Sequence, residues 1–333
     1  MKILLASDAW APQVNGVVRT MLTVIHELEA LGHTIVTLTP DQCFTIPCPF
    51  YKEIRLAINP GGAVARLIEE AKPDAIHIVT EGPIGIAARR WCLKHGLRFT
   101  TAYHTRFPEY LAVRYIAPKR FTYALLRRFH APAARVMVAT ESVRRELASH
   151  GFSNLAPWGR GVDPALFDPG LRDELSEFAR PVFLYVGRVA HEKNLPAFLG
   201  LDLPGSKVVV GEGPALAALK SRYPDVHFLG KREGRALGRA YASADVFVFP
   251  SRTDTFGLVV LEALASGVPV AAYPVPGPLD VLSGSGAGAL DDDLQRAALT
   301  ALELPRARCR EHALRFSWSA CARQFLDQLC PAR

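Results

Sequence analysis

The sequence predicts an α/β protein with two doubly wound domains, in each of which helices cover both faces of a parallel sheet. At 333 residues the chain is long enough for two domains of ordinary size. Short apolar runs alternate with segments of helical periodicity in both halves of the chain, as in consecutive βα units. Between the halves, residues 157–170 contain three prolines and three glycines, which favours a connection between domains.

In the first half, short runs rich in Val, Ile, Leu and Ala predict buried parallel strands, because both faces of such a strand meet apolar neighbours. These strands are expected at residues 2–6, 34–38, 75–79, 98–102 and 135–139. Between them, apolar residues recur every three or four positions, which predicts helices at 17–31, 63–71, 84–95 and 142–150. The sequence therefore predicts a first domain over residues 1–160.

The same alternation resumes after the proline-rich connection, which we place at residues 161–170. Strands are expected at 182–186, 207–210, 226–229, 246–249 and 268–272, with helices between them. Residues 290–330 are predicted to be helical throughout. We therefore expect a second domain over residues 171–310, followed by terminal helices at 311–333 that pack back on the first domain.

The composition is that of an ordinary globular protein, with 49% apolar and 21% charged residues. No apolar stretch approaches the roughly 20 residues of a membrane span, and nothing resembles a secretory signal. The six cysteines show neither CxxC pairs nor the spacing of metal ligands. These features predict a reduced, cytoplasmic protein without a metal site.

The net charge of +7 is unevenly distributed along the chain. Residues 1–168 carry 20 basic and 14 acidic side chains, whereas residues 169–333 carry 19 and 18. Within residues 85–145, 13 basic side chains are accompanied only by Glu109 and Glu141. Such a section suits an anionic partner, either a lipid surface or a nucleic acid.

The most informative stretch is 251–270, in which Asp254 and Glu262 stand eight residues apart. A buried strand ends at Pro250, and a helix is expected to follow Gly257. The start of a helix offers backbone N–H groups and the positive end of a dipole, which suits a phosphate. Glu262, about two turns in, is placed to accept hydrogen bonds from sugar hydroxyls. On these residues alone, a capped helix with a solvated Glu explains the stretch equally well.

The loop after the first strand, residues 8–16, ends in the turn dipeptide Asn15-Gly16 just before a helix. Glycine lets the backbone approach a phosphate closely. The chain has no GxGxxG or GxxxxGK[ST] pattern, which weakens the dinucleotide and P-loop interpretations. A plain β–α turn remains an equal alternative for this loop.

The loop after the strand at 182–186 carries two cations, Arg188 and Lys193, five residues apart. Two cations on one loop can bind a diphosphate from two sides and stabilise negative charge on a leaving group. Gly211 stands in a second glycine turn after the next strand. A solvated basic pair is the alternative interpretation.

Polar side chains also follow the strand at 98–102, in Tyr103-His104-Thr-Arg106. The carboxyl ends of parallel strands are where doubly wound domains bind ligands. His104 is therefore our candidate among the ten histidines, although loop histidines are more often structural. Neither DxD nor HExxH occurs, so leaving-group charge would fall to Arg188, Lys193 and a helix N-terminus in place of a metal ion.

Together these motifs resemble glycosyltransferase family 4, whose members have the GT-B fold: two Rossmann-like doubly wound domains that face a central cleft. The spacing of Asp254 and Glu262, followed by Ser-Gly-Val-Pro, resembles the donor-site motif, with Asp where the family usually has Glu. Gly-Arg-x-x-x-x-Lys at 187–193 resembles the phosphate-binding loop. The landmarks fall in the family's order over nearly the whole chain.

The resemblance implies roles for these residues. Glu262 would bind the ribose hydroxyls, Arg188 and Lys193 the diphosphate, and Asp254 the donor sugar. His104 would lie near that sugar, so the implied catalytic set is His104, Asp254, Arg188 and Lys193. The other residues implied in donor binding are Asn15, Gly16, Val17, Gly211, Phe256, Gly257 and Leu258. Candidate acceptor contacts are Tyr103, Arg106 and Tyr110.

The resemblance thus implies a retaining, metal-independent glycosyltransferase without a cofactor. It would move a hexosyl residue from GDP-mannose or a UDP-sugar to a membrane lipid or lipid-linked glycan, giving an α-glycoside. Two alternatives stay open. One is a 2-epimerase that acts on a UDP-HexNAc, and the other is a non-catalytic nucleic-acid-binding module. The basic section lacks a recognisable RNA-binding motif, so no nucleic-acid partner is expected.

A helix over residues 119–130 would combine basic and apolar residues. Phe121, Leu125 and Phe129 recur at i, i+4 and i+8 and are expected to share a face. The basic residues at this helix are Lys119, Arg120, Arg127 and Arg128. Either the helix packs in the core with a solvated basic rim, or it rests on an anionic bilayer. The second interpretation predicts peripheral attachment to the inner face of the plasma membrane.

Overall fold

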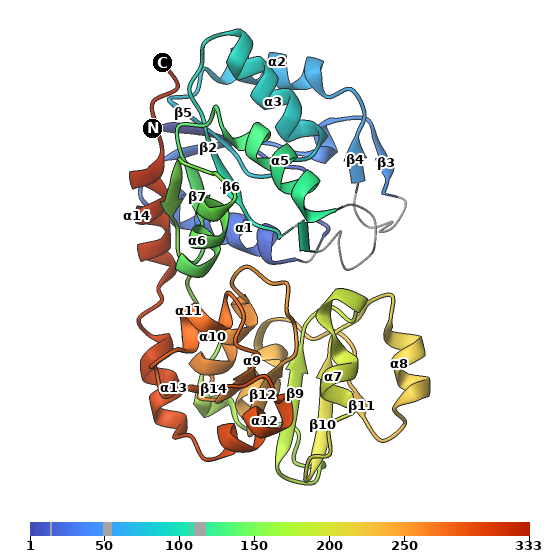
Figure 1. Cartoon of the computed structure of the whole chain (residues 1–333). Coiled ribbons are helices and arrows are strands. Elements are labelled where there is room, and N and C mark those ends of the chain that lie inside the picture. Colours follow the sequence, from blue (N-terminus) through green and yellow to red (C-terminus); the bar gives the residue numbers. More distant parts are fainter. Residues whose placement is uncertain (14, 49–54, 107, 110–117) are drawn as a thin grey trace. The chain divides into compact units, whose positions relative to one another are not determined.

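The computed structural model describes residues 1–13, 15–48, 55–106, 108–109 and 118–333 (Figure 1). The chain forms two compact units. Unit 1 consists of Met1–Arg160 together with Trp318–Arg333, and unit 2 consists of Gly161–Ser317. The division therefore falls directly after Arg160, and residues 161–170 belong to unit 2.

Unit 1 contains a six-stranded parallel sheet in the order β2-β1-β5-β6-β7-β8. Its strands are β1 (Lys2–Ala6), β2 (Thr34–Leu38), β5 (Ala75–Ile78), β6 (Thr100–Tyr103), β7 (Val136–Val138) and β8 (Leu155–Pro157). The helices are α1 (Gly16–Ala30), α2 (Gly61–Ala71), α3 (Pro83–Lys94), α5 (Lys119–His130), α6 (Glu141–Ser149) and α14 (Trp318–Gln328). An antiparallel pair, β3 (Thr45–Pro47) and β4 (Arg55–Ala57), and a short 3-10 helix, η1 (Pro40–Gln42), complete the unit.

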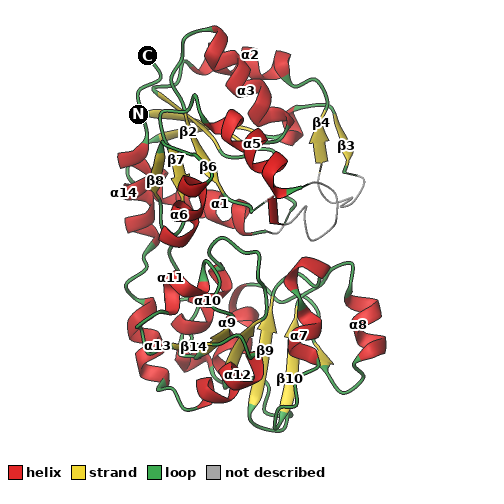
Figure 2. Cartoon of the chain, in the orientation of Figure 1, coloured by secondary structure: helices red, strands yellow, loops and turns green. Residues whose placement is uncertain are grey.

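The first strand shows why this sheet carries helices on both faces (Figure 2). Leu4 and Ala6 lie in one buried apolar cluster, whereas Ile3 and Leu5 lie in another. Successive side chains of a strand point to opposite faces, so both faces of β1 are covered. A continuous apolar run is therefore what this position requires.

Unit 2 repeats the architecture with the strand order β11-β10-β9-β12-β13-β14. Its strands are β9 (Val182–Val186), β10 (Ser206–Val210), β11 (His227–Phe228), β12 (Val246–Phe249), β13 (Val270–Ala272) and β14 (Gly288–Leu290). The helices are α7 (Leu195–Leu199), α8 (Leu216–Arg222), α9 (Gly234–Ser243), α10 (Leu258–Ala265), α11 (Pro278–Leu282), α12 (Leu294–Leu302) and α13 (Arg306–Ala313). The 3-10 helices are η2 (Pro169–Leu171) and η3 (His191–Lys193).

The predicted α/β class with two Rossmann-like parallel-sheet domains is confirmed. Four strands (β1, β2, β9 and β12) and helix α5 have the predicted bounds. The sequence did not indicate β8 or β14, which contain no β-branched or aromatic residue. The prediction of continuous helix over 290–330 was wrong, because turns at 303–305 and 314–317 divide it into α12, α13 and α14.

The last helix, α14, belongs to unit 1 and lies beside α1 (Figure 1). It holds the segment that follows β8. Trp158 Nε1 donates to the carbonyl oxygen of Cys321 at 3.3 Å, and Gly159 N donates to Gln324 Oε1 at 2.7 Å. All six cysteines are free thiols. None of the helices in the described ranges is long and apolar enough to cross a membrane.

Candidate active site

The strand order of unit 2 has its switch point between β9 and β12. The chain runs from β9 outward to β10 and β11, and then returns to place β12 on the other side of β9. At such a switch point the loops beyond the two carboxyl ends diverge, and doubly wound sheets bind ligands there. The loop after β9 carries Arg188 and Lys193, and the loop after β12 carries Asp254.

Side-chain contacts join these two loops. Lys193 Nζ donates to Asp254 Oδ1 at 2.6 Å, and both side chains are about three-quarters buried, with exposed fractions of 25% and 22%. Asn194 Nδ2 donates to the carbonyl oxygen of Pro250 at 3.1 Å. A predicted phosphate-binding cation and a predicted sugar-binding carboxylate thus form an ion pair in the ligand-free structure.

The glycines of the predicted phosphate loops are required by close backbone packing. Gly211 has φ +146°, and a Cβ atom there would lie 1.9 Å from the carbonyl oxygen of Gly187. Gly213 has φ +156°, and its Cβ would lie 2.4 Å from the carbonyl oxygen of Val189. Backbone hydrogen bonds join the same segments, including Val189 N to the carbonyl oxygen of Glu212 at 2.8 Å. The loop after β9 and the loop after β10 therefore pack backbone against backbone on either side of Arg188, with no side chain between them.

Tyr185, near the end of β9, holds the start of the loop that carries Arg188 and Lys193. Its hydroxyl donates to the carbonyl oxygen of Arg188 at 2.9 Å, and the side chain is 1% exposed. Burial raises the pKa of the Tyr185 phenol, and the negative charges of Asp254 and Glu192 raise it further. The phenol therefore stays a neutral donor, which holds the Arg188 carbonyl in place.

Helix α10 follows the loop after β12 and begins after Gly257, which has φ +83°. Gly277 packs against Phe256, because a Cβ atom at Gly277 would lie 2.8 Å from the carbonyl oxygen of Phe256. Glu262 is the fifth residue of α10, little more than one turn from its start, so the prediction of two turns was too long. It is only 3% exposed, and Tyr241 donates its hydroxyl hydrogen to Glu262 Oε2 at 2.9 Å.

In unit 1, Asn15 caps α1, with its Oδ1 accepting from the backbone N–H groups of Val17 and Val18 at 3.0 Å each. A residue that the sequence did not single out, Asp8, holds the start of α3. Its carboxylate is 8% exposed and accepts from Thr80 Oγ1 and from backbone N–H groups. Burial raises the Asp8 pKa. The donor-binding roles of Asn15, Gly16 and Val17 stay predictions.

His104 follows β6 and is partly buried. Its Nδ1 lies 3.3 Å from Arg160 Nη2, and its ring meets Trp158 edge-on with centroids 5.5 Å apart. Burial, the positive charge of Arg160 and the proximity of His77 lower the His104 pKa well below its usual value. His104 is therefore a neutral imidazole at physiological pH.

Two of the three candidate acceptor contacts, Tyr103 and Arg106, are buried. Tyr103 is the last residue of β6 and is 1% exposed, whereas the sequence placed it in a loop. Arg106 is 8% exposed and donates from Nη2 to both carboxylate oxygens of Glu146, at 2.7 and 2.9 Å. Tyr110 lies outside the described residues. Tyr123 joins the same network through hydrogen bonds of 2.9 Å to Glu146 and to Glu109.

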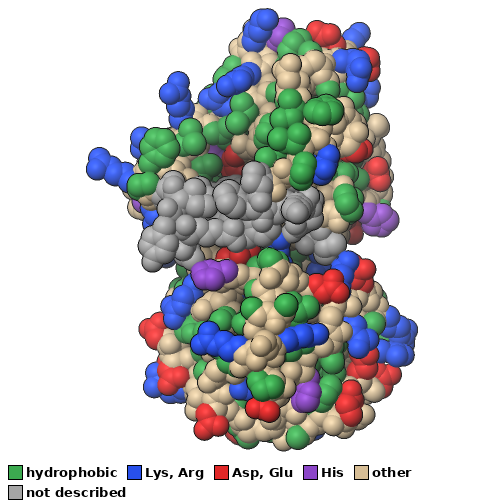
Figure 3. All heavy atoms as spheres, turned by 90° about the vertical axis from the view of Figure 1, so that its right-hand side faces the viewer, with side chains coloured by type: hydrophobic (Ala, Val, Ile, Leu, Met, Phe, Trp, Pro, Cys, Tyr) green, Lys and Arg blue, Asp and Glu red, His purple; other side chains and the backbone are tan. Residues whose placement is uncertain are grey.

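Helix α5 exposes apolar side chains next to basic ones. Phe121 and Leu125 are 65% and 59% exposed, but Phe129 is 9% exposed, so the three do not share a face as expected. Eight residues turn a helix about 80° past two full turns, which carries Phe129 into the core. The exposed basic residues are Lys119, Arg120, Arg127 and Arg128. Figure 3 shows one face of unit 1, on which hydrophobic side chains lie beside Lys and Arg side chains.

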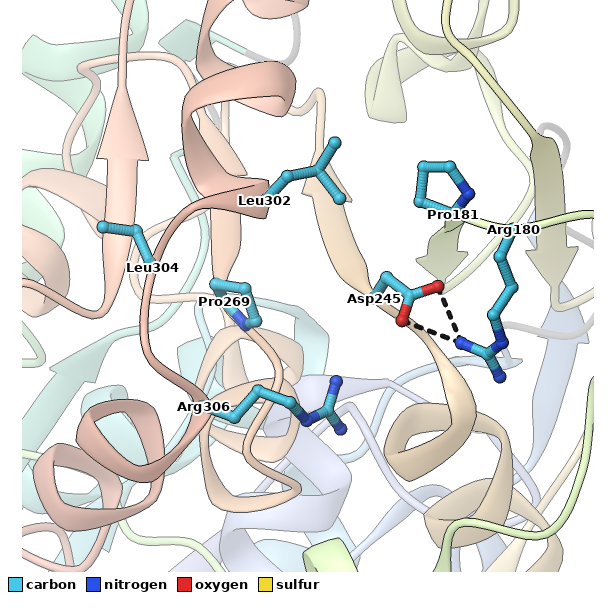
Figure 4. A pocket seen from close by; sticks show the side chains of 7 residues that line it. All are labelled: Arg180, Pro181, Asp245, Pro269, Leu302, Leu304 and Arg306. Carbon is cyan, nitrogen blue, oxygen red and sulfur yellow. Dashed lines mark hydrogen bonds and ion pairs between the residues drawn. The ribbon is translucent and has the colours of Figure 1, made fainter.

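A pocket of about 360 Å³ lies at the opposite, amino-terminal ends of β9, β12 and β13 (Figure 4). Arg180 Nη1 lies 2.7 Å from both carboxylate oxygens of Asp245. Arg306 donates to the carbonyl oxygens of Ala244 and Ala242 at 2.7 and 2.8 Å. These arginines bind the end of α9 and the segment between α9 and β12, so we assign the pocket a structural role. Within the described ranges, no three His, Cys, Asp or Glu side chains gather as metal ligands.

Three residues that contact the predicted site were not found from the sequence, namely Tyr185, Tyr241 and Arg160. Tyr241 lies 21 residues from Glu262, and Arg160 lies 56 residues from His104. No spacing pattern connects residues so far apart. The only sequence signal was the Trp-Gly-Arg-Gly-Val-Asp stretch at 158–163, which we had assigned in part to the connection between domains.

Comparisons with known proteins show the family to which the chain belongs. The family model described as "Glycosyltransferase Family 4" matches residues 14–166, and that of "Glycosyl transferases group 1" matches residues 180–304. A GDP-mannose-dependent alpha-mannosyltransferase of Mycobacterium tuberculosis is 30% identical over 316 residues, which cover 87% of this chain and 83% of the relative. An alpha-monoglucosyldiacylglycerol synthase of Streptococcus pneumoniae is 29% identical, with 94% and 81% covered.

Solved structures share the fold. The sucrose-phosphate synthase of Thermosynechococcus elongatus has a TM-score of 0.78 at 22% identity, covering 98% of this chain and 97% of that one. HepE of Anabaena, in complex with UDP and glucose, has a TM-score of 0.72 at 15% identity, covering 98% of each chain. The predicted GT-B fold class is therefore confirmed. With two family models in sequence along the chain and a curated relative at 30% identity, the protein belongs to glycosyltransferase family 4 and is a glycosyltransferase.

Proposed function

We propose that the protein is a retaining glycosyltransferase that transfers a hexosyl residue from a nucleoside-diphosphate sugar to a lipid acceptor. The observation that carries the donor class is the contact between the loops after β9 and β12, where Lys193 and Asp254 meet at 2.6 Å. A cation at the carboxyl ends of parallel strands suits a diphosphate. A carboxylate in contact with that cation suits the hydroxyls of the attached sugar.

In this proposal Arg188 and Lys193 bind the diphosphate and stabilise the charge that develops as the glycosidic bond breaks. Asp254 binds the donor sugar and orients Lys193 before the donor arrives. Glu262, buried in α10 and held by Tyr241, binds the ribose hydroxyls. The acceptor hydroxyl attacks from the face that the leaving diphosphate vacates, and the diphosphate takes the acceptor proton. The product is then an α-glycoside, and no metal ion is needed for the charge.

One relative, an alpha-monoglucosyldiacylglycerol synthase, supports a lipid acceptor, and another, a GDP-mannose-dependent alpha-mannosyltransferase, supports a mannosyl donor. GDP-mannose is therefore the first donor to test, followed by UDP-sugars. The purified protein is incubated with each donor, a lipid extract and EDTA. We expect a glycolipid with an α linkage at undiminished rate in EDTA. An activity abolished by EDTA and restored by Mg²⁺ or Mn²⁺ contradicts the metal-free mechanism.

Incubation with the donor alone tests the epimerase alternative on the same fold. A 2-epimerase converts a UDP-HexNAc without an acceptor, whereas a transferase leaves the donor sugar intact or only hydrolyses it slowly. Epimerised donor in the absence of lipid contradicts the transferase proposal.

Helix α5 supports attachment to a membrane surface. Phe121 and Leu125 protrude beside exposed arginines, and an anionic bilayer attracts each nearby cation with about 1 kcal/mol. We expect binding to vesicles with anionic lipid, weakened by salt and by the Arg120→Glu/Arg127→Glu/Arg128→Glu variant.

A matched control reverses three exposed cations of unit 2 instead, in Arg222→Glu/Lys231→Glu/Arg235→Glu. Both variants change the net charge by the same amount, so a specific role of α5 predicts loss of binding in the first alone. Equal binding to neutral and anionic vesicles, or equal loss in both variants, contradicts the α5 proposal.

A further inference from the structure

A buried arginine lies beside His104 and has no carboxylate partner among the described residues. Arg160 is 7% exposed, although a buried guanidinium normally pairs with an acid because its desolvation is costly. Its Nη1 donates to the carbonyl oxygens of Trp158 and Gly159 at 2.8 Å each. Its Nη2 lies 3.3 Å from His104 Nδ1. Burying the Arg160 charge costs desolvation free energy, and Arg160 contacts a predicted site residue, His104. Both facts suggest that Arg160 has a functional role.

The Arg160 guanidinium is fixed in position as well as buried. Its Cζ lies 4.3 Å from the centre of the Trp158 ring, which is fully buried and supports the cation from one side. Helix α14 fixes this platform in turn through the bond from Trp158 Nε1 to the Cys321 carbonyl oxygen. The geometry at His104 is therefore rigid.

The contact determines which nitrogen of His104 carries the proton. Arginine has five donors and no acceptor, so Nδ1 must accept the hydrogen bond from Nη2. A neutral imidazole whose Nδ1 accepts has its proton on Nε2. A second proton on Nδ1 would face the guanidinium charge at hydrogen-bond distance, so the imidazolium is strongly disfavoured.

From this geometry we infer that Arg160 is a positioning residue, which holds His104 as the neutral Nε2–H tautomer. His104 then acts through Nε2 as a hydrogen-bond donor to an oxygen of the bound substrate. It is not available as a general base, because the only unprotonated nitrogen is occupied by Arg160. The role in substrate binding rests on the proposed function, whereas the tautomer is a property of the ligand-free protein.

The charged and titratable groups around this pair agree with the inference. Burial lowers the pKa of His104, and the positive charge of Arg160 lowers it further. Burial lowers the pKa of Arg160 to about 10, and Cys321 opposes this weakly. Arg160 therefore stays charged at neutral pH while His104 stays uncharged.

Nuclear magnetic resonance of the full-length protein with ¹⁵N-labelled histidine tests this without any substrate. The resonances of His104 are identified by their loss in His104→Gln. We expect Nε2 to show the shift of a protonated nitrogen and Nδ1 that of an unprotonated, hydrogen-bonded one, without titration between pH 5.5 and 8. A wild-type His104 with its proton on Nδ1, or one that titrates near pH 6.5, overturns the proposal.

Two variants test the role of Arg160 itself. Arg160→Met removes the charge and the donors, and we expect the His104 pKa to rise and the Nδ1 shift to change. Arg160→Lys keeps the charge and one donor, and we expect it to restore the wild-type spectrum in large part. Arg135→Met is the matched control, since Arg135 is an exposed arginine of unit 1 that donates to the Asp327 carbonyl oxygen.

If Arg160→Met does not fold, the wild-type measurement and Arg160→Lys still decide the question. An unchanged His104 spectrum in folded Arg160→Met contradicts the positioning role. A confirmed tautomer in a protein without transferase activity would leave this inference standing and remove the proposed function, so the two are separable.

Discussion

Replacing Gly211 by alanine tests whether the phosphate loops of unit 2 depend on direct backbone contact. The new Cβ would lie 1.9 Å from the carbonyl oxygen of Gly187, at a residue with φ +146°. Alanine in this glycine-only region costs about 1–3 kcal/mol. Relieving the clash must also move the loop and weaken one or two neighbouring hydrogen bonds, at about 1 kcal/mol each. We therefore expect unit 2 to lose about 2–5 kcal/mol of stability.

The assay uses a difference between the two units. All four tryptophans, Trp10, Trp91, Trp158 and Trp318, belong to unit 1, so their fluorescence reports unit 1 unfolding. Hydrogen exchange of the β9 and β10 amides reports unit 2. We expect faster exchange in β9 and β10 of Gly211→Ala, together with loss of the thermal stabilisation given by the sugar-nucleotide donor.

Gly234→Ala is the matched control for backbone strain. Gly234 also lies in unit 2 and has φ +52°, but a Cβ atom there meets nothing within 4 Å. This variant should cost only about 1–2 kcal/mol and leave donor stabilisation intact. If Gly211→Ala exchanges no faster than Gly234→Ala and still responds to the donor, the close approach of the two loops is not important for either stability or binding.

Three further predictions concern single side chains. Lys193→Ala should lower turnover about 10²-fold or more, because the side chain no longer stabilises the charge of the leaving diphosphate. Lys231 is an exposed lysine of the same unit, so Lys231→Ala should leave turnover unchanged. Wild-type turnover in Lys193→Ala would remove Lys193 from the diphosphate site. Glu262→Ala should weaken donor binding, measured by calorimetry. Tyr241→Phe should weaken donor binding less, by about tenfold, because it removes only the buried hydrogen bond to Glu262. Unchanged donor affinity in both variants would contradict the role of Glu262 in binding the ribose. His77 is fully buried, and burial lowers its pKa from 6.5 to about 3. Because the folded state disfavours protonation, stability is complete above pH 6.5 and falls by about 1.4 kcal/mol per pH unit between 6.5 and about 3. Urea unfolding followed by tryptophan fluorescence at pH 7 and 5 should show this loss, and His77→Phe should reduce it; an equal loss in that variant would assign the acid sensitivity to other groups.

Local sequence patterns were sufficient for the fold class and for most of the elements. A strand such as β9 is a continuous apolar run because both of its faces are covered, and this requirement is visible in five consecutive residues. Arg188, Lys193, Asp254 and Glu262 were singled out by their positions after strand ends or near a helix start, and the resemblance to the family supplied their predicted roles. Chain order alone then placed them at carboxyl ends of parallel strands, where ligands bind.

The tertiary structure decided which of these residues meet and which side chains support them. Lys193 and Asp254 are 61 residues apart, and they form an ion pair only because β12 is placed next to β9. The hydrogen bond from Tyr241 to Glu262 and the contact of Arg160 with His104 depend on the same kind of long-range packing. The periodicity of apolar residues shows which face of a helix or strand is buried. It does not show which distant helix or strand packs against that face. The sequence by itself therefore determined the fold class and the donor-site motifs, whereas strand order and packing determined the hydrogen-bond partners that set protonation and orientation.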